Sequence, residues 1–190
     1  EKGLCECILI ERAGIDEILA AFQEFSNQIV IFHFAGHAGA FQLCLETASG
    51  NEEIAHAGGL ATFLGLQKGL ELVFLNGCPT RKQVEQLLHS GLGSVIATSQ
   101  AIADQAASDF SIRFYQSLSS GDSLDKSYRE AAAAVQIRFE SSQLYHRSSF
   151  NPDLIGNPDR LPWELHVRAG ADIVRNWNLP EASGNPLFGL

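Results

Sequence analysis

The fold of this chain is decided by two short segments, IVIFHFAGHAG (residues 29–39) and ELVFLNGCPT (residues 71–80). Each contains an uninterrupted apolar run that is typical of a buried parallel strand, and each then delivers one reactive side chain, His37 or Cys78. Open α/β sheets bind their ligands beyond the carboxyl ends of the strands. We therefore predict that neighbouring parallel strands bring His37 and Cys78 together as a candidate base and nucleophile.

A free thiol is only slightly ionised at neutral pH, so a nucleophilic cysteine needs an adjacent base and a favourable field. His37 would supply the base. A helix predicted to begin near Arg81 would add the positive end of its dipole behind Cys78. The spacing alone equally allows a buried cysteine and a loop histidine that do not touch.

The rest of the sequence alternates between expected strands and helices. Strands are predicted at 4–10, 29–34, 41–46, 72–75, 93–98 and 163–167, the last at a sheet edge, and residues 47–53 form a polar turn. Helices are predicted at 14–25, 58–69, 81–90, 104–118, and from 121 past 134, as far as Tyr145 at most. The strand at 4–10, the first helix and the strand at 29–34 would form a right-handed β-α-β unit. We expect an α/β fold, a three-layer αβα sandwich with a mostly parallel sheet.

Composition limits the classes of function. The chain has 190 residues, 45% of them hydrophobic and 18% charged, which suits one domain with a substantial core. Its net charge of −9 argues against binding to nucleic acid. No apolar run reaches the about 18 residues needed to span a bilayer, and the N-terminus lacks a secretory signal layout. We expect a cytoplasmic protein with no membrane partner.

For the other cysteines and for His33, the sequence predicts no catalytic role. Four cysteines are too few for a disulfide scaffold, which fits a reducing compartment. Cys5 and Cys7 share one face of the expected strand at 4–10, where we predict buried thiols. A zinc site made of His33, His37 and a cysteine is conceivable, but no spacing resembles a zinc motif, so a packed His33 is favoured. We expect no metal and no cofactor.

The ordered set of motifs resembles the CHAT domain, a caspase-related module of many bacterial sensor proteins. The motifs are HFAGH (33–37), LNGCPT (75–80), SVIAT (94–98), IAD (102–104), FYQSL (114–118) and PWEL (162–165). The resemblance implies caspase-like topology and a cysteine endopeptidase that works through a thioester on Cys78 with His37 as the base. It implies oxyanion donors in the backbone N–H groups of Ala38 or Gly39 and of Cys78. Family members usually have glycine directly after the histidine, where this chain has Ala38.

Asp104 follows from the same resemblance as a candidate specificity residue. In separase, a caspase-like peptidase, an aspartate in the equivalent stretch helps to receive a basic P1 side chain. Asp104 would then form part of the S1 pocket. The alternative is that Asp104 only favours the start of its helix, where a carboxylate suits the exposed amides.

The resemblance also implies a biological setting. It suggests a protein substrate and a role in bacterial signalling or anti-phage defence, with a regulatory sensor or a STAND NTPase domain in cis or in trans. We expect a peptidase domain over residues 1–178, without the family's first strand and helix, and a linker toward a following domain at 179–190. Two alternatives stay open: a catalytically inactive caspase-like interaction module, and a thiol acyltransferase.

Overall fold

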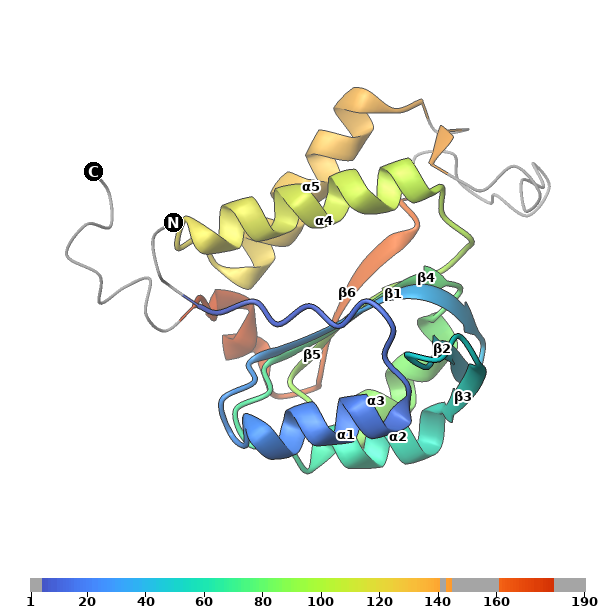
Figure 1. The fold of residues 1–190 in the computed structure, drawn as a ribbon. Coiled ribbons are helices and arrows are strands. Elements are labelled where there is room, and N and C mark those ends of the chain that lie inside the picture. Colours follow the sequence, from blue (N-terminus) through green and yellow to red (C-terminus); the bar gives the residue numbers. More distant parts are fainter. Residues whose placement is uncertain (1–4, 141–142, 145–160, 180–190) are drawn as a thin grey trace. The chain divides into compact units, whose positions relative to one another are not determined.

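The computed structural model describes residues 5–140, 143–144 and 161–179, and of Cys78 it describes the backbone. The chain forms two compact units, and Figure 1 labels the helices and strands that belong to them. The sheet unit comprises residues 9–101 and 162–171. The helical unit takes in the described residues within 1–8, 102–161 and 172–190. The predicted linker lies outside the described residues except for Leu179.

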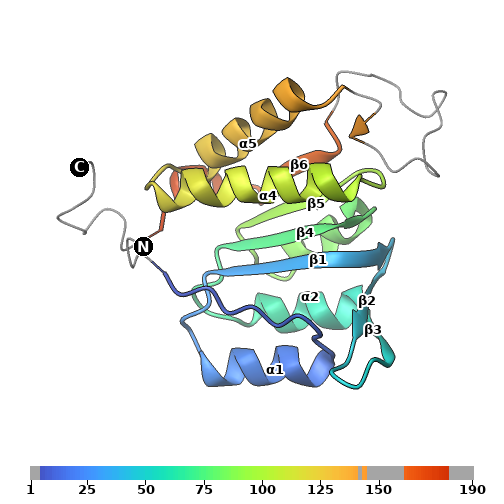
Figure 2. The ribbon, with the colours of Figure 1, turned by 45° about the horizontal axis from the view of Figure 1, so that its top comes forward.

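A mixed sheet forms the centre of the sheet unit, with strand order β3-β2-β1-β4-β5-β6 (Figure 2). The strands are β1 (Ile31–Gly39), β2 (Gln42–Glu46), β3 (Glu52–His56), β4 (Leu72–Cys78), β5 (Ser94–Thr98) and β6 (Trp163–Val167). β1, β4 and β5 pair in parallel, whereas the other three pairings are antiparallel. The prediction of an α/β fold with a parallel core is confirmed, and β6 lies at an edge as expected.

One face of the parallel core packs against the helices of the sheet unit (Figure 2). These helices are α1 (Ile15–Glu24), α2 (Ala57–Gly65) and α3 (Val84–His89). Because successive strand residues point to opposite faces, alternate residues of each strand reach this core. The apolar cluster contains Phe32, Phe34, Val73, Leu75, Val95 and Ala97 from the strands with Ile18, Phe22, Ala61, Leu64, Val84 and Leu87 from the helices. His33 and Phe74 therefore belong to the opposite face of the sheet.

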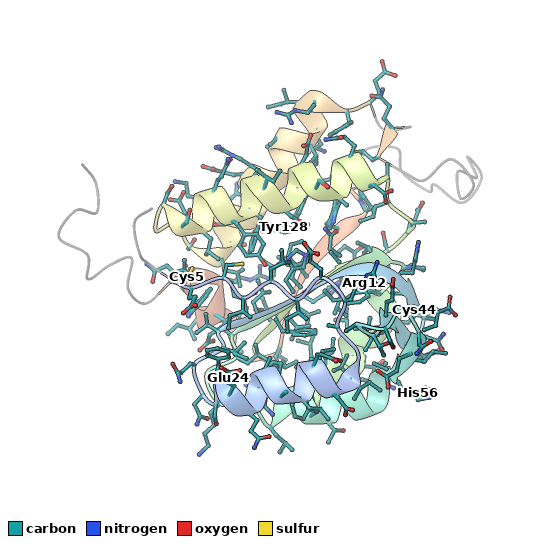
Figure 3. All side chains as sticks on the ribbon, in the orientation of Figure 1. Cys5, Arg12, Glu24, Cys44, His56 and Tyr128 are labelled. Atoms are coloured by element: carbon teal, nitrogen blue, oxygen red, sulfur yellow. The ribbon has the colours of Figure 1, made fainter. Side chains whose placement is uncertain are left out.

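The predicted strand at 4–10 is wrong. Residues 5–10 form neither strand nor helix and are exposed, and Leu4 lies outside the described residues. A strand needs a partner for its backbone groups. The place beside β1 that the expected β-α-β unit requires is taken, because β2 and β4 already flank β1. Cys5 and Cys7 are correspondingly exposed rather than buried, and Cys5 is labelled in Figure 3.

The predicted turn at 47–53 ends earlier than expected, because β3 begins at Glu52. β3 pairs antiparallel with β2, and Glu46 and Glu52 are Cα partners. The carboxylate of Glu53 accepts a 2.6 Å hydrogen bond from the backbone N–H of Ile15. This bond joins β3 to the first turn of α1, where the free amides and the helix dipole favour a carboxylate.

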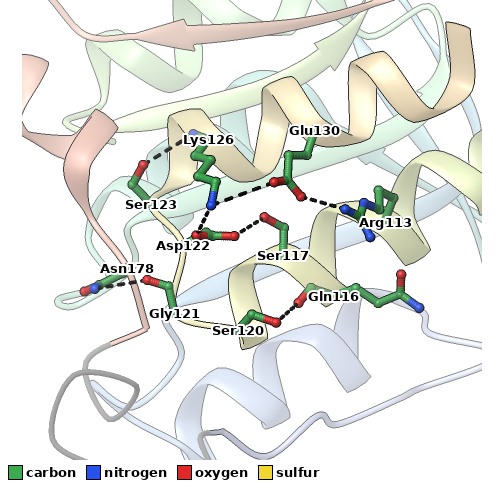
Figure 4. Close-up of polar contacts among 10 residues, drawn as sticks. All are labelled: Arg113, Gln116, Ser117, Ser120, Gly121, Asp122, Ser123, Lys126, Glu130 and Asn178. Carbon is green, nitrogen blue, oxygen red and sulfur yellow. Dashed lines mark hydrogen bonds and ion pairs between the residues drawn. The ribbon is translucent and has the colours of Figure 1, made fainter. Parts of the chain in front are cut away.

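The helical unit contains α4 (Asp104–Ser119), α5 (Leu124–Arg138) and a 3-10 helix at Asp172–Asn176. α4 and α5 lie side by side (Figures 1 and 2), and α5 ends well before Tyr145, which lies outside the described residues. Polar contacts fix the turn between them (Figure 4): Asp122 accepts from Lys126 at 2.6 Å and from Ser117 at 2.8 Å. The hydrogen bond from Lys126 lowers the pKa of Asp122. None of the helices in the described parts of the chain is long and apolar enough to cross a bilayer.

Candidate functional site

His37 and Cys78 occupy matched positions on adjacent strands. β1 and β4 run parallel, and the two residues are Cα partners at the carboxyl end of their ladder. Paired strands lie about 4.8 Å apart, so the two backbones are direct neighbours. His37 is exposed. The sequence predicted a strand that ends at residue 34, before His37. The observed strand β1 continues to Gly39, where it pairs with β2, so His37 lies within the strand.

The backbone of β1 leaves no room for a side chain on β4 one residue before the pair. A Cβ atom at Gly77 would lie 2.6 Å from the carbonyl oxygen of Gly36 and 3.2 Å from the Cβ of Ala38. Only glycine fits this position without moving the backbone of β1. In the described residues the only non-glycine with positive φ is Asn27, so Ala38 has an ordinary backbone conformation. Alanine in place of the expected glycine therefore introduces no strain at residue 38.

A buried hydroxyl fixes the turn that follows Cys78. Thr80 is fully buried, and its Oγ1 donates to the carbonyl oxygen of Leu75 at 3.1 Å. The same Oγ1 accepts from the backbone N–H of Thr98 at 3.0 Å, and the Thr98 hydroxyl donates to the carbonyl oxygen of Gly77. Because Leu75 and Gly77 belong to β4 and Thr98 ends β5, these bonds tie both sides of the Cys78 turn to the sheet.

The helix predicted at 81–90 is split into two short pieces. A 3-10 turn, Arg81–Gln83, precedes α3, which has six residues. A helix dipole grows with the number of aligned peptide units. We therefore assign no stabilisation of a Cys78 thiolate to this helix, and the expectation of a dipole effect is not supported.

Gln83, in the 3-10 turn, was not anticipated from the sequence. Its side chain is 1% exposed, and Nε2 donates to the carbonyl oxygens of Gly39 at 2.9 Å and Gln42 at 3.3 Å. A sequence signal existed, because Gln83 lies four residues before the buried Leu87 and so shares its helical face. A buried amide requires partners, which the end of β1 and the start of β2 provide.

His33 is a packed side chain on the same strand as His37, four residues before it. Its ring stacks on Phe74 with centroids 4.3 Å apart and planes 4° apart. Burial lowers the pKa of His33 from 6.5 to about 4, because desolvation penalises the imidazolium. His33 is therefore neutral at physiological pH. Among the side chains that the structure describes, no three His, Cys, Asp or Glu residues are grouped so that they could hold a metal ion.

The remaining predicted site residues are placed as follows. Ala38 and Gly39 lie in β1, with Leu43 and Gln42 of β2 as their Cα partners. Asp104 belongs to the helical unit, where it is exposed and forms the first residue of α4, as the predicted helix required. The residue in the N-cap position is Ala103, which makes no side-chain capping bond.

The sequence matches the model of one protein family over most of its length. The CHAT domain model matches residues 4–152. The chain belongs to the CHAT domain family. No curated protein matches the sequence at a significant level. CHAT domains are related to caspase-like cysteine peptidases, so the parallel core that carries His37 and Cys78 belongs to a peptidase-related fold.

Proposed function

We propose that this CHAT domain is a regulated cysteine endopeptidase in which His37 and Cys78 form the catalytic dyad. The observation that carries the proposal is the register of β1 and β4, in which the two residues are direct Cα partners. Membership of a peptidase-related family supports it. A nucleophile and a base on adjacent strand ends, one of them exposed to solvent, suit attack on an extended protein substrate.

The reaction we propose has two halves. In the first, His37 takes the thiol proton of Cys78, the sulfur attacks the scissile carbonyl carbon, and His37 then protonates the leaving amine. In the second, His37 takes a proton from water, the hydroxyl oxygen attacks the thioester, and Cys78 leaves as the thiol after receiving that proton. The oxyanion in both halves would be held by the backbone N–H of Cys78 and that of Ala38 or Gly39. The step requires no cofactor.

Two further assignments belong to this proposal. Asp104 would receive a basic P1 side chain, because a carboxylate in a binding pocket attracts Arg or Lys and repels Asp or Glu. A regulatory sensor or a STAND NTPase domain, in cis or in trans, would switch the peptidase on in bacterial signalling or anti-phage defence in the cytoplasm. Both assignments are supported by the family relationship rather than by contacts in the chain.

A labelling experiment tests the dyad and separates it from its rivals. The full chain is incubated with a peptidyl acyloxymethyl ketone, a peptide electrophile that reacts with activated thiols, and the adducts are located by mass spectrometry. We expect labelling of Cys78 in the wild type and its loss in His37→Ala. Cys44, an exposed thiol on β2 (Figure 3), is the internal control and should stay unlabelled.

The other outcomes each identify a rival. Labelling of Cys78 by acyl thioesters but not by the peptidyl reagent would indicate a thiol acyltransferase. Absence of any selective labelling of Cys78, both in the chain alone and in the presence of its regulatory domain, with all the reactivity at exposed thiols such as Cys44, would indicate an inactive interaction module. Either outcome overturns the peptidase proposal.

A further inference from the structure

One buried side chain joins the two halves of the candidate site. Gln83 lies five residues after Cys78, and its Nε2 donates to the carbonyl oxygen of Gly39, two residues after His37, at 2.9 Å. Nε2 also donates to the carbonyl oxygen of Gln42 at 3.3 Å. The two N–H protons of the amide thus each have an acceptor. A single side chain therefore bonds the segment after Cys78 to the strand that carries His37.

The two acceptors are themselves paired. Gly39 and Gln42 are Cα partners across β1 and β2 and enclose the two-residue turn of that hairpin. The amide of Gln83, which is not part of the β1–β2 ladder, thus binds the turn end of the hairpin. Because Gln83 is 1% exposed, water cannot easily replace it, and removing the amide would leave two carbonyl oxygens poorly satisfied.

Both ends of this link are held in place. On the Cys78 side, Thr80 bonds to β4 and β5, and the 3-10 turn begins at the next residue. Val84 and Leu87, which follow Gln83, are buried in the core of the sheet unit. The amide therefore extends from a segment that is anchored in the core of the sheet unit. Movement of the hairpin against that segment would change the separation of His37 and Cys78.

We propose that Gln83 is a positioning residue of the dyad: it holds the end of β1 in register with the turn that follows Cys78. The inference rests on the proposed function, because it assigns Gln83 to the geometry of that same pair. Misplacement of reacting groups by about 1 Å lowers rates on the order of 10²-fold. Loss of the amide should therefore weaken the activation of Cys78 by His37 in a chain that remains folded.

The test measures the reactivity of Cys78 directly. Cys5, Cys7 and Cys44 are replaced by serine in the full chain, which leaves Cys78 as the single thiol of the original four. The second-order rate of alkylation by iodoacetamide is then measured from pH 5 to pH 9 for this reference and for His37→Ala, Gln83→Met and Gln83→Glu. Two control variants are Gln86→Glu, at an exposed glutamine of α3, and Leu87→Ala, which truncates a buried neighbour without removing a hydrogen bond to the hairpin. Circular dichroism checks that every variant is folded at the assay temperature.

We expect Gln83→Met to alkylate about 10- to 100-fold more slowly than the reference near neutral pH, whereas Leu87→Ala and Gln86→Glu keep the reference rate. In Gln83→Glu, the alkylation rate of Cys78 should be lowered to an extent that depends on pH. The ionised carboxylate of this variant would repel the two carbonyl oxygens, whereas the protonated carboxyl can donate one hydrogen bond again. The ratio of its rate to that of Gln86→Glu should therefore rise toward one as the pH falls.

The contrary outcomes are distinct. If His37→Ala lowers the rate but Gln83→Met does not, the inference about Gln83 is overturned and the dyad stands. An equal loss in Gln83→Met and Leu87→Ala also overturns it, because that result reflects general loosening. If His37→Ala reacts like the reference, the dyad itself is wrong and the role of Gln83 falls with it. Should Gln83→Met fail to fold, the pH-dependent ratio of Gln83→Glu decides, and a flat ratio overturns the inference.

Discussion

The indole Nε1 of Trp163 donates a 2.9 Å hydrogen bond to Oδ1 of Asn76. Trp163 begins β6 and Asn76 lies in β4, so this bond passes across the intervening strand β5. Both side chains are buried, at 1% and 6% exposure. Asn76 stands two residues before Cys78, and the bond therefore connects the edge of the sheet to the strand that carries the candidate nucleophile.

Replacing Trp163 by phenylalanine should destabilise the protein. The change removes the indole donor and leaves Oδ1 of Asn76 without that bond in a buried place, at a cost of roughly 1–3 kcal/mol. Urea unfolding followed by circular dichroism measures the effect. Trp177→Phe is the matched control, because Trp177 is only half-buried and its backbone carbonyl, which accepts from Leu124, is kept. Equal losses in the two variants would show that the Asn76 bond contributes nothing specific.

The hydroxyl of Thr80 should matter more than its methyl group. Thr80→Val keeps the shape of the side chain but removes the donor to Leu75 and the acceptor for Thr98, and we expect a loss of about 1–3 kcal/mol in the free energy of unfolding. Thr62→Val, at an exposed position of α2, should change stability by less than about 0.5 kcal/mol. A Thr80→Val protein as stable as Thr62→Val would refute the role of this hydroxyl in fixing the Cys78 turn.

The lowered pKa of His33 predicts that the folded protein loses stability in acid. The pKa of about 4 in the fold lies below the ordinary value of 6.5, so the unfolded chain binds a proton that the folded chain does not. The contribution of His33 is present above about pH 6.5 and is lost as the pH falls toward 4. The loss is about 2 kcal/mol, given that the ring stays partly exposed.

The comparison that isolates this effect uses two histidine variants. His33→Phe keeps an aromatic ring on Phe74 and removes the titration, so its unfolding free energy should fall less than that of the wild type between pH 7 and pH 4.5. His56→Phe, at an exposed position of β3, should keep the wild-type pH dependence. Parallel pH curves for wild type and His33→Phe would contradict the assignment.

The proposed role of the Asp104 carboxylate in the S1 pocket predicts that the peptidase cleaves after basic residues. Asp104→Ala should reduce cleavage after Arg and Lys by about tenfold or more relative to the wild type, with the fold retained. Asp172→Ala, which removes a carboxylate that is 83% exposed in the same unit, is the control and should leave cleavage unchanged. A survey of cleavage sites that gives apolar or acidic P1 residues would remove Asp104 from the site.

Two strands of the parallel core, β4 and β5, were predictable because each is buried on both faces and reads as an apolar run. β4 and β5 contain such runs and were found within a few residues of their true ends. β3 was missed, because an edge strand with the sequence EEIAH is defined by its pairing with β2 and not by its own composition. The prediction of a strand at 4–10 failed for the converse reason. The alternating apolar pattern of these residues favours a strand, but no strand of the described sheet pairs with residues 5–10.

The candidate pair was predictable, whereas the contacts around it were not. His37 and Cys78 each end an apolar run, and parallel strands align their carboxyl ends. The bonds of Trp163 to Asn76 and of Gln83 to Gly39 join residues 87 and 44 positions apart, and no local pattern encodes them. Gln83 alone left a sign, as a polar residue on the inward face of a predicted helix.

The central claim, that Cys78 and His37 cleave proteins as one unit, is tested most directly by new protein N-termini. Cells producing the wild-type chain, Cys78→Ala, His37→Ala or the double variant are compared by mass spectrometry of enriched N-terminal peptides. Members of a catalytic unit are strongly non-additive, so both single variants should lose the wild-type set of new termini and the double variant should be scarcely worse. Persistence of the same new termini in Cys78→Ala, or their absence from wild-type cells that also contain the regulatory domain, would contradict the claim.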